Sequence, residues 1–119
     1  MNVLFLEYPK CSTCQKAKKW LDEHQVSYTD RHIKDQNPNA SELEEWIKKS
    51  GLPSKKFFNT SGLLYKSMAL KDKLPDMDFN AQIQLLSTDG MLVKRPLIIG
   101  DDFVLVGFKP EEWEKILTV

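Results

Sequence analysis

Two cysteines, Cys11 and Cys14, stand close together near the start of the sequence, and the chain contains no others. An apolar run at residues 3–6 precedes them and predicts a buried strand over residues 3–7. Residues 12–24 carry apolar side chains at helical spacing, which predicts an amphipathic helix. The Cys-x-x-Cys pair therefore lies at a junction between a strand and a helix. The fold of the chain has to contain such a junction near its first residues.

This position gives the two thiols different expected roles. A helix N-terminus carries partial positive charge and unpaired N–H groups, both of which favour a thiolate. We expect Cys11, in the first turn, to be the nucleophile. Cys14, one turn further and nearer the core, is then the resolving thiol that closes a disulfide. Ser12 and Gln15 have the spacing of a capping box, and Lys10 adds positive charge nearby.

Two other interpretations of the pair remain open, namely incidental buried thiols or half of a zinc site. A zinc site needs two more ligands, and the only histidines, His24 and His32, fit no standard zinc spacing. We therefore expect redox chemistry at the cysteines and no metal.

Composition excludes several other classes of function. The 119 residues are the length of one domain, and we take 1–119 as a single domain. Basic and acidic residues number 17 each, so the formal net charge is zero, which argues against direct binding of nucleic acid or of a membrane surface. No apolar run approaches the roughly 20 residues of a membrane span. The first residues lack the pattern of a signal peptide, so we expect a cytoplasmic protein.

The rest of the chain predicts an α/β fold. Residues 26–33 alternate apolar and polar side chains and predict a second strand, parallel to the first. A helical insertion is expected at about 40–88. In it, Ser41 and Glu44 form a second capping-box pattern, and Gly51 ends the first helix. A second short helix is expected at 64–70, and Asp78 caps a third.

The last third of the sequence returns to strands. Residues 97–99 and 103–106 predict a hairpin, and Pro110 begins a final helix. Gly107 predicts a bulge or a close backbone approach. The order β-α-β, helical insertion, β-β-α with a Cys-x-x-Cys after the first strand indicates a thioredoxin-like fold, with a mixed four-stranded sheet and flanking helices.

Arg95-Pro96 is the second feature with functional meaning. In thioredoxin-like proteins the equivalent proline is cis and faces the active cysteine. Pro96 would then bring Arg95 close to Cys11. A guanidinium there would bind an oxyanion or stabilise the thiolate.

Several segments together resemble the ArsC/Spx family of arsenate-reductase-like proteins over nearly the whole chain. They are residues 8–17, the block from 52 to 66 with Phe58-Asn59-Thr60, residues 94–98, and residues 106–111. The resemblance implies the thioredoxin-like fold, a nucleophilic Cys11 and an oxyanion-binding Arg95.

The sequence also departs from the arsenate reductases of that family, which use three arginines around the cysteine. Arg95 matches one of them, whereas Asn59 and Lys109 stand at the other two positions. The second thiol, Cys14, is more similar to the Spx branch, whose members regulate transcription by binding RNA polymerase.

The first hypothesis is therefore an arsenate reductase-like thiol–disulfide oxidoreductase that acts on a small oxyanion or disulfide. Its expected catalytic residues are Cys11, Cys14 and Arg95, and its expected substrate-binding residues are Lys10, Ser12, Asn59, Pro96 and Lys109. No cofactor is expected to be bound, and electrons would come from glutaredoxin and glutathione or from thioredoxin. The alternatives are an Spx-like redox-sensing regulator that binds RNA polymerase, and an adaptor domain with a vestigial thiol pair.

Overall fold

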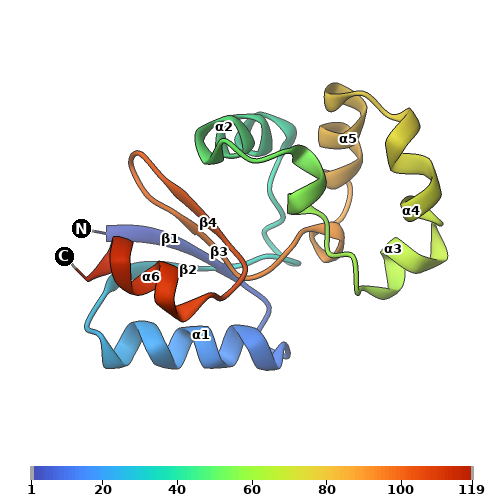
Figure 1. Ribbon diagram of the computed structural model, residues 1–119. Coiled ribbons are helices and arrows are strands. Elements are labelled where there is room, and N and C mark those ends of the chain that lie inside the picture. Colours follow the sequence, from blue (N-terminus) through green and yellow to red (C-terminus); the bar gives the residue numbers. More distant parts are fainter. Residues whose placement is uncertain (1, 119) are drawn as a thin grey trace.

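The computed structural model describes residues 2–118 and contains one mixed sheet of four strands (Figure 1). Their order in the sheet is β2-β1-β3-β4; β1 pairs with β2 in parallel, and the β1–β3 and β3–β4 pairs are antiparallel. The strands are β1 (Asn2–Glu7), β2 (Ser27–His32), β3 (Leu97–Ile99) and β4 (Val104–Val106). This topology is the thioredoxin-like α/β fold that the sequence predicted.

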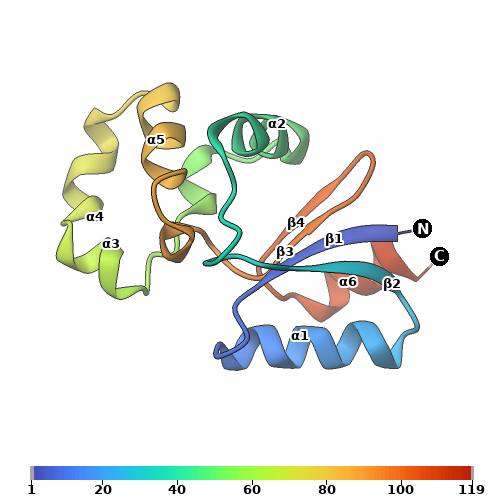
Figure 2. The same ribbon diagram turned by 180° about the vertical axis from the view of Figure 1, so that it is seen from behind.

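Helices lie on both faces of the sheet and beyond one end of it (Figures 1 and 2). The helices of the core are α1 (Ser12–Glu23) and α6 (Pro110–Leu117). Those of the insertion and its exit are α2 (Ala40–Ser50), η1 (Ser54–Phe57), α3 (Leu63–Ser67), α4 (Leu70–Lys73), η2 (Leu74–Asp76), α5 (Phe79–Leu86) and η3 (Gly90–Leu92). Within residues 2–118 no helix is long and apolar enough to cross a membrane.

Alternate residues of the strands supply two separate hydrophobic clusters. Val3 and Phe5 of β1 pack with Trp113 in the cluster that joins the sheet to α1 and α6. Leu6 packs instead in the cluster that contains Leu43 of α2, because side chains alternate between the faces of a strand. The second cluster continues without a break into α3, α4 and α5, so the insertion shares one core with the sheet.

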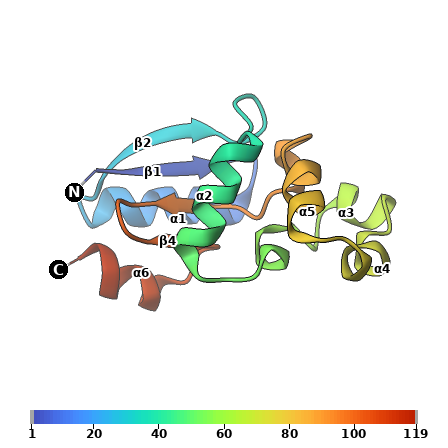
Figure 3. The same cartoon turned by 90° about the horizontal axis from the view of Figure 1, so that it is seen from above.

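The insertion helices α3, α4 and α5 extend past the end of β1 (Figures 1 and 3). The loop from β1 to α1, which carries Cys11, lies at that same end of the sheet (Figure 1). The loop that carries Cys11 therefore lies at the end of the sheet that faces the insertion.

Both predicted capping boxes are wrong, although the helices exist. Ser12 is already the first residue of α1, so it cannot occupy the N-cap; Cys11 does, without a side-chain cap. The Gln15 amide donates instead to the Pro9 carbonyl oxygen at 2.8 Å. Helix α2 likewise begins before Ser41, and its capping box is formed by Asn39 and Glu42.

Two further helix ends lie where the sequence predicted them, and one predicted helix is broken in two. Gly51 ends α2 in the left-handed region, and Asp78 caps α5 by accepting a hydrogen bond from the Ala81 N–H at 2.7 Å. The expected helix at 64–70 is broken at Ala69, whose φ of 53° is left-handed, so it forms the short helices α3 and α4.

Candidate active site

The two cysteines occupy different environments although they are one helical turn apart. Cys11 is half-buried at the N-cap of α1, and its N–H donates to the Tyr8 carbonyl oxygen at 2.9 Å. Cys14 is fully buried in the first turn of the helix. Both thiols are free. An incoming group can therefore reach Cys11 but not Cys14.

The surroundings of Cys11 favour its thiolate. Burial alone would raise the pKa of the Cys11 thiol. Hydrogen bonds from the Cys14 backbone and thiol and from the Arg95 guanidinium, together with the Arg95 charge, outweigh burial and lower that pKa. A thiolate is the nucleophilic form of cysteine, so this environment activates Cys11.

The surroundings of Cys14 have the opposite effect. Burial raises the pKa of its thiol to about 12, and both the hydrogen bond with Cys11 and the charge of the Cys11 thiolate add to this rise. Cys14 is therefore harder to ionise than Cys11, which is the asymmetry expected of a nucleophile and its resolving partner.

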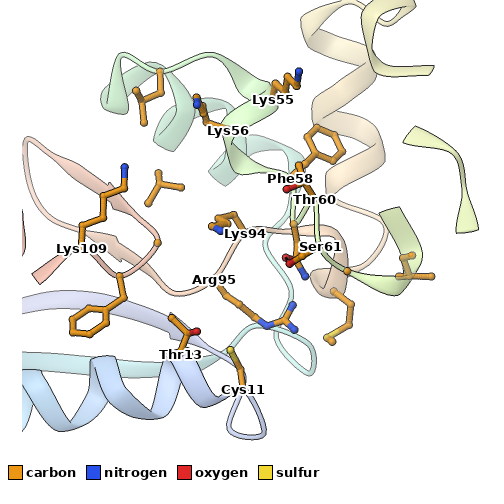
Figure 4. A pocket seen from close by; sticks show the side chains of 18 of the residues that line it. Cys11, Thr13, Lys55, Lys56, Phe58, Thr60, Ser61, Lys94, Arg95 and Lys109 are labelled. Carbon is orange, nitrogen blue, oxygen red and sulfur yellow. Dashed lines mark hydrogen bonds between the residues drawn. The ribbon is translucent and has the colours of Figure 1, made fainter. Parts of the chain in front are cut away.

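Arg95 lies next to Cys11 at the base of the site (Figure 4). The Arg95–Pro96 peptide bond is cis, as expected from the fold. The guanidinium carbon lies 5.3 Å from the centre of the Tyr8 ring, within the range of a cation–π contact. The Nε and Nη1 atoms are buried and have no acceptor within residues 2–118. Two oriented donors without partners beside a thiolate are suited to an oxyanion or a carboxylate.

These groups lie in a pocket of about 1090 Å³ between the sheet and the insertion (Figure 4). Cys11, Arg95 and Lys109 line it from the thioredoxin-like core, and Asn59 from the insertion. Its further cationic residues are Lys34, Lys55, Lys56 and Lys94, and its acidic ones are Asp89 and Glu112. No motif in the sequence predicted that these four additional lysines belong to the site.

Four of the other predicted site residues do not line the pocket. Lys10 and Ser12 are exposed and do not line the pocket, whereas Cys14 and Pro96 are buried outside its lining. Asn59, which is 8% exposed, accepts a hydrogen bond from the Ser61 hydroxyl at 3.3 Å. In the part of the chain that the structure describes, no three His, Cys, Asp or Glu side chains are grouped to hold a metal ion.

Comparison with known proteins places this architecture among its relatives. The profile of the ArsC family matches residues 6–116. A solved ArsC family related protein from Bacteroides fragilis is 63% identical, with a TM-score of 0.94 and 97% of each chain covered. A structure described as a possible arsenate reductase from Streptococcus mutans is 43% identical, with a TM-score of 0.86, and covers 94% of this chain and 97% of its own.

Relatives of known sequence include both an uncharacterised protein and a regulator. YusI of Bacillus subtilis is 50% identical over 97% of this chain and 98% of its own length. The global transcriptional regulator Spx of Staphylococcus epidermidis is 31% identical over 92% of this chain and 82% of its own length. With the cysteine junction, the cis proline and the sheet topology in place, these matches establish that the chain belongs to the ArsC family.

Proposed function

We propose that this protein is an arsenate reductase-like thiol–disulfide oxidoreductase, in which Cys11 is the nucleophile and Cys14 the resolving thiol. The observation that carries the proposal is the placement of the two thiols one helical turn apart, with Cys11 half-buried at the N-cap of α1 and Cys14 fully buried behind it. The lowered pKa of Cys11 and the raised pKa of Cys14 agree with these roles. The unpartnered Nε and Nη1 donors of Arg95 support an anionic substrate group beside the thiolate.

With a disulfide substrate, the Cys11 thiolate attacks one sulfur, and the substrate's sulfur–sulfur bond breaks. A mixed disulfide forms on Cys11, and the first substrate thiolate leaves. Cys14 then loses its proton and attacks the Cys11 sulfur, which releases the second substrate thiolate. The protein loses two electrons in forming the Cys11–Cys14 disulfide, and the substrate gains both.

With arsenate, Cys11 displaces one oxygen, which leaves as water after taking up two protons. Attack by Cys14 on the Cys11 sulfur then breaks the sulfur–arsenic bond, and the electron pair of that bond stays on arsenic. Arsenic is thereby reduced from the +5 to the +3 state. In both cases we propose that glutaredoxin and glutathione, or thioredoxin, return two electrons to the protein disulfide in the cytoplasm.

The order of the two steps follows from the coupling between the thiols. Once Cys11 carries an adduct it no longer has a negative charge, so two of the influences that raise the pKa of Cys14 disappear. Burial still opposes ionisation of Cys14. Formation of the adduct therefore eases deprotonation of the thiol that resolves it.

Single-turnover mass spectrometry tests this assignment. Reduced protein is mixed separately with arsenate and with a small disulfide, and the state of both cysteines is followed over time. We expect Cys14→Ser to accumulate a covalent adduct on Cys11, and Cys11→Ser to form none. Equal reactivity of Cys11→Ser and the parent protein would contradict the proposal.

The similarity to Spx supports a second candidate, a redox-sensing regulator that binds RNA polymerase. In that case the Cys11–Cys14 disulfide would change a protein-binding surface rather than complete a catalytic cycle. Pull-down of purified RNA polymerase by the reduced and the oxidised protein distinguishes the two. Redox-dependent binding together with no turnover in the presence of a thiol donor would favour the regulator.

A further inference from the structure

The pocket collects cationic side chains that lack acidic partners. Among residues 2–118, no carboxylate oxygen lies within 4 Å of the charged nitrogens of Lys34, Lys55, Lys56, Lys94 or Arg95. Lys109 makes only a long contact of 3.8 Å with Glu112. In a chain whose net charge is zero, six cationic residues line this pocket against two acidic ones, Asp89 and Glu112, so the pocket carries an excess of positive charge.

The pocket is also larger than one oxyanion requires. A volume of about 1090 Å³ is slightly above the range for pockets that bind drug-sized molecules, about 300–1,000 Å³. Arg95 and Cys11 occupy only its base, whereas Lys55 and Lys56 lie at the wall formed by the insertion (Figure 4). Lys94 lies between Arg95 and Lys56 in that view.

The surface of the pocket is not purely polar. Phe58, Val104 and Val106 line it, together with Leu52 and Leu63, which are 41% and 86% exposed. Apolar side chains among charged groups are suited to a ligand that combines a hydrocarbon segment with an anionic end.

From these observations we propose that Lys55 and Lys56, assisted by Lys94, form a second anion subsite. It would bind a carboxylate or phosphate group of a low-molecular-weight disulfide whose sulfur reaches Cys11. This inference rests on the proposed thiol–disulfide chemistry and specifies its substrate class. The chemical step is the one described above: the substrate disulfide is reduced by two electrons to two thiols, and Cys11 and Cys14 are oxidised to a disulfide.

Two series of symmetric disulfides test the subsite. One series ends in carboxylates and the other in hydroxyls, with alkyl chains of equal and increasing length in both. Rates of oxidation of the reduced protein are measured at low and high ionic strength. We expect the parent protein to prefer the carboxylate series by about tenfold at low salt, and expect the preference to shrink at high salt because the charges are screened. The chain length of greatest preference reports the reach from Cys11 to the lysines.

Matched variants locate the effect. Lys55→Gln with Lys56→Gln should reduce the ratio of carboxylate to hydroxyl rates to about twofold, mainly by raising the disulfide concentration that gives half of the maximal oxidation rate. Lys71→Gln with Lys73→Gln is the control, because these two exposed lysines also belong to the insertion but do not line the pocket. This control should keep the ratio of the parent. All four positions are exposed, and circular dichroism checks that the variants remain folded.

The outcomes separate this inference from the proposed function. If both series oxidise the protein at equal rates, or if the control variant loses as much preference as the pocket variant, the subsite is wrong while the oxidoreductase function stands. If neither series nor arsenate oxidises Cys11, the proposed function fails and the subsite fails with it.

Discussion

At the scale of single residues, the geometry around Arg95 depends on an aromatic ring. The Arg95 guanidinium lies over the Tyr8 ring, and two of its buried nitrogens have no acceptor within the described chain. The ring face offers negative electrostatic potential to a cation without accepting its hydrogen bonds in full. We therefore expect Tyr8 to act as a positioning residue that holds Arg95 beside Cys11 and leaves its donors free for a ligand.

Replacing Tyr8 by leucine should weaken the activation of Cys11. The cation–π contact contributes about 1 kcal/mol, so we expect roughly a fivefold slower reaction of Cys11 at neutral pH. The pH profile of its alkylation by iodoacetamide should also move to higher pH, because a displaced Arg95 stabilises the thiolate less. Alkylation rates measured across a pH series check both effects.

The matched variant for this test is Tyr8→Phe, which keeps the ring and removes only the hydroxyl. It should retain the profile of the parent protein. A profile shifted equally in Tyr8→Phe and Tyr8→Leu would assign the effect to the hydroxyl and contradict the role of the ring.

At the scale of elements, the sequence located the strands and most helices, but it misplaced the N-caps of α1 and α2. Both Asn39-x-x-Glu42 and Ser41-x-x-Glu44 fit the capping pattern, and they lie two residues apart. Asparagine and serine are almost equally good N-caps, so local propensity does not decide between them. The choice depends on where the chain leaves the loop after β2, which is a tertiary property.

Asn39→Ala and Ser41→Ala should differ in their effect on the stability of the protein. The Asn39 side chain accepts from the Glu42 N–H at 2.8 Å, so its loss should lower the free energy of unfolding by about 1 kcal/mol. Ser41 is exposed within α2, and its replacement by alanine should change that free energy by less than about 0.5 kcal/mol. Urea unfolding of the two variants measures the difference. The cap assignment fails if Ser41→Ala is the more damaging.

At the scale of the whole molecule, a charged contact ties the sheet to the insertion. Arg31 of β2 donates to both carboxylate oxygens of Glu42 in α2, at 2.7 and 2.9 Å. Its guanidinium also lies 5.8 Å from the ring centre of Trp46. The hydrogen bonds from Arg31 are the largest influence on Glu42 and lower the pKa of its carboxyl group from the ordinary value of 4.5.

The stabilisation from this contact should disappear in acid. Because the folded-state pKa of Glu42 is lower than the unfolded value, the contribution is present above about pH 4.5 and is lost as pH falls through the folded value. Both side chains are partly solvated, so we expect about 1 kcal/mol. Unfolding free energies at pH 7 and pH 3 should differ less in Glu42→Gln than in the parent protein. Equal acid sensitivity of the two proteins would rule out this contribution.

Some residues of the site could be predicted from the sequence, whereas others depend on how the whole molecule packs. Cys11 could be found from the sequence because the Cys-x-x-Cys motif has its own chemistry, and Arg95 because Arg95-Pro96 matches a segment of the family it resembles. Lys34, Lys55 and Lys94 come from three separate segments, and in the sequence they are indistinguishable from lysines of a solvated face. Only the packing of the insertion against the sheet brings them to one pocket.

The joint between the insertion and the sheet has a further consequence. A β-carbon at Gly90, just after α5, would lie 1.8 Å from the carbonyl oxygen of Ile33, just after β2. The two backbones therefore pack against each other with no room for a side chain between the insertion and the sheet. We expect this joint to limit movement of the insertion against the sheet and so to keep the separation of the two pocket walls nearly constant. The site would then select its ligands by their length, because its walls do not close around a shorter ligand.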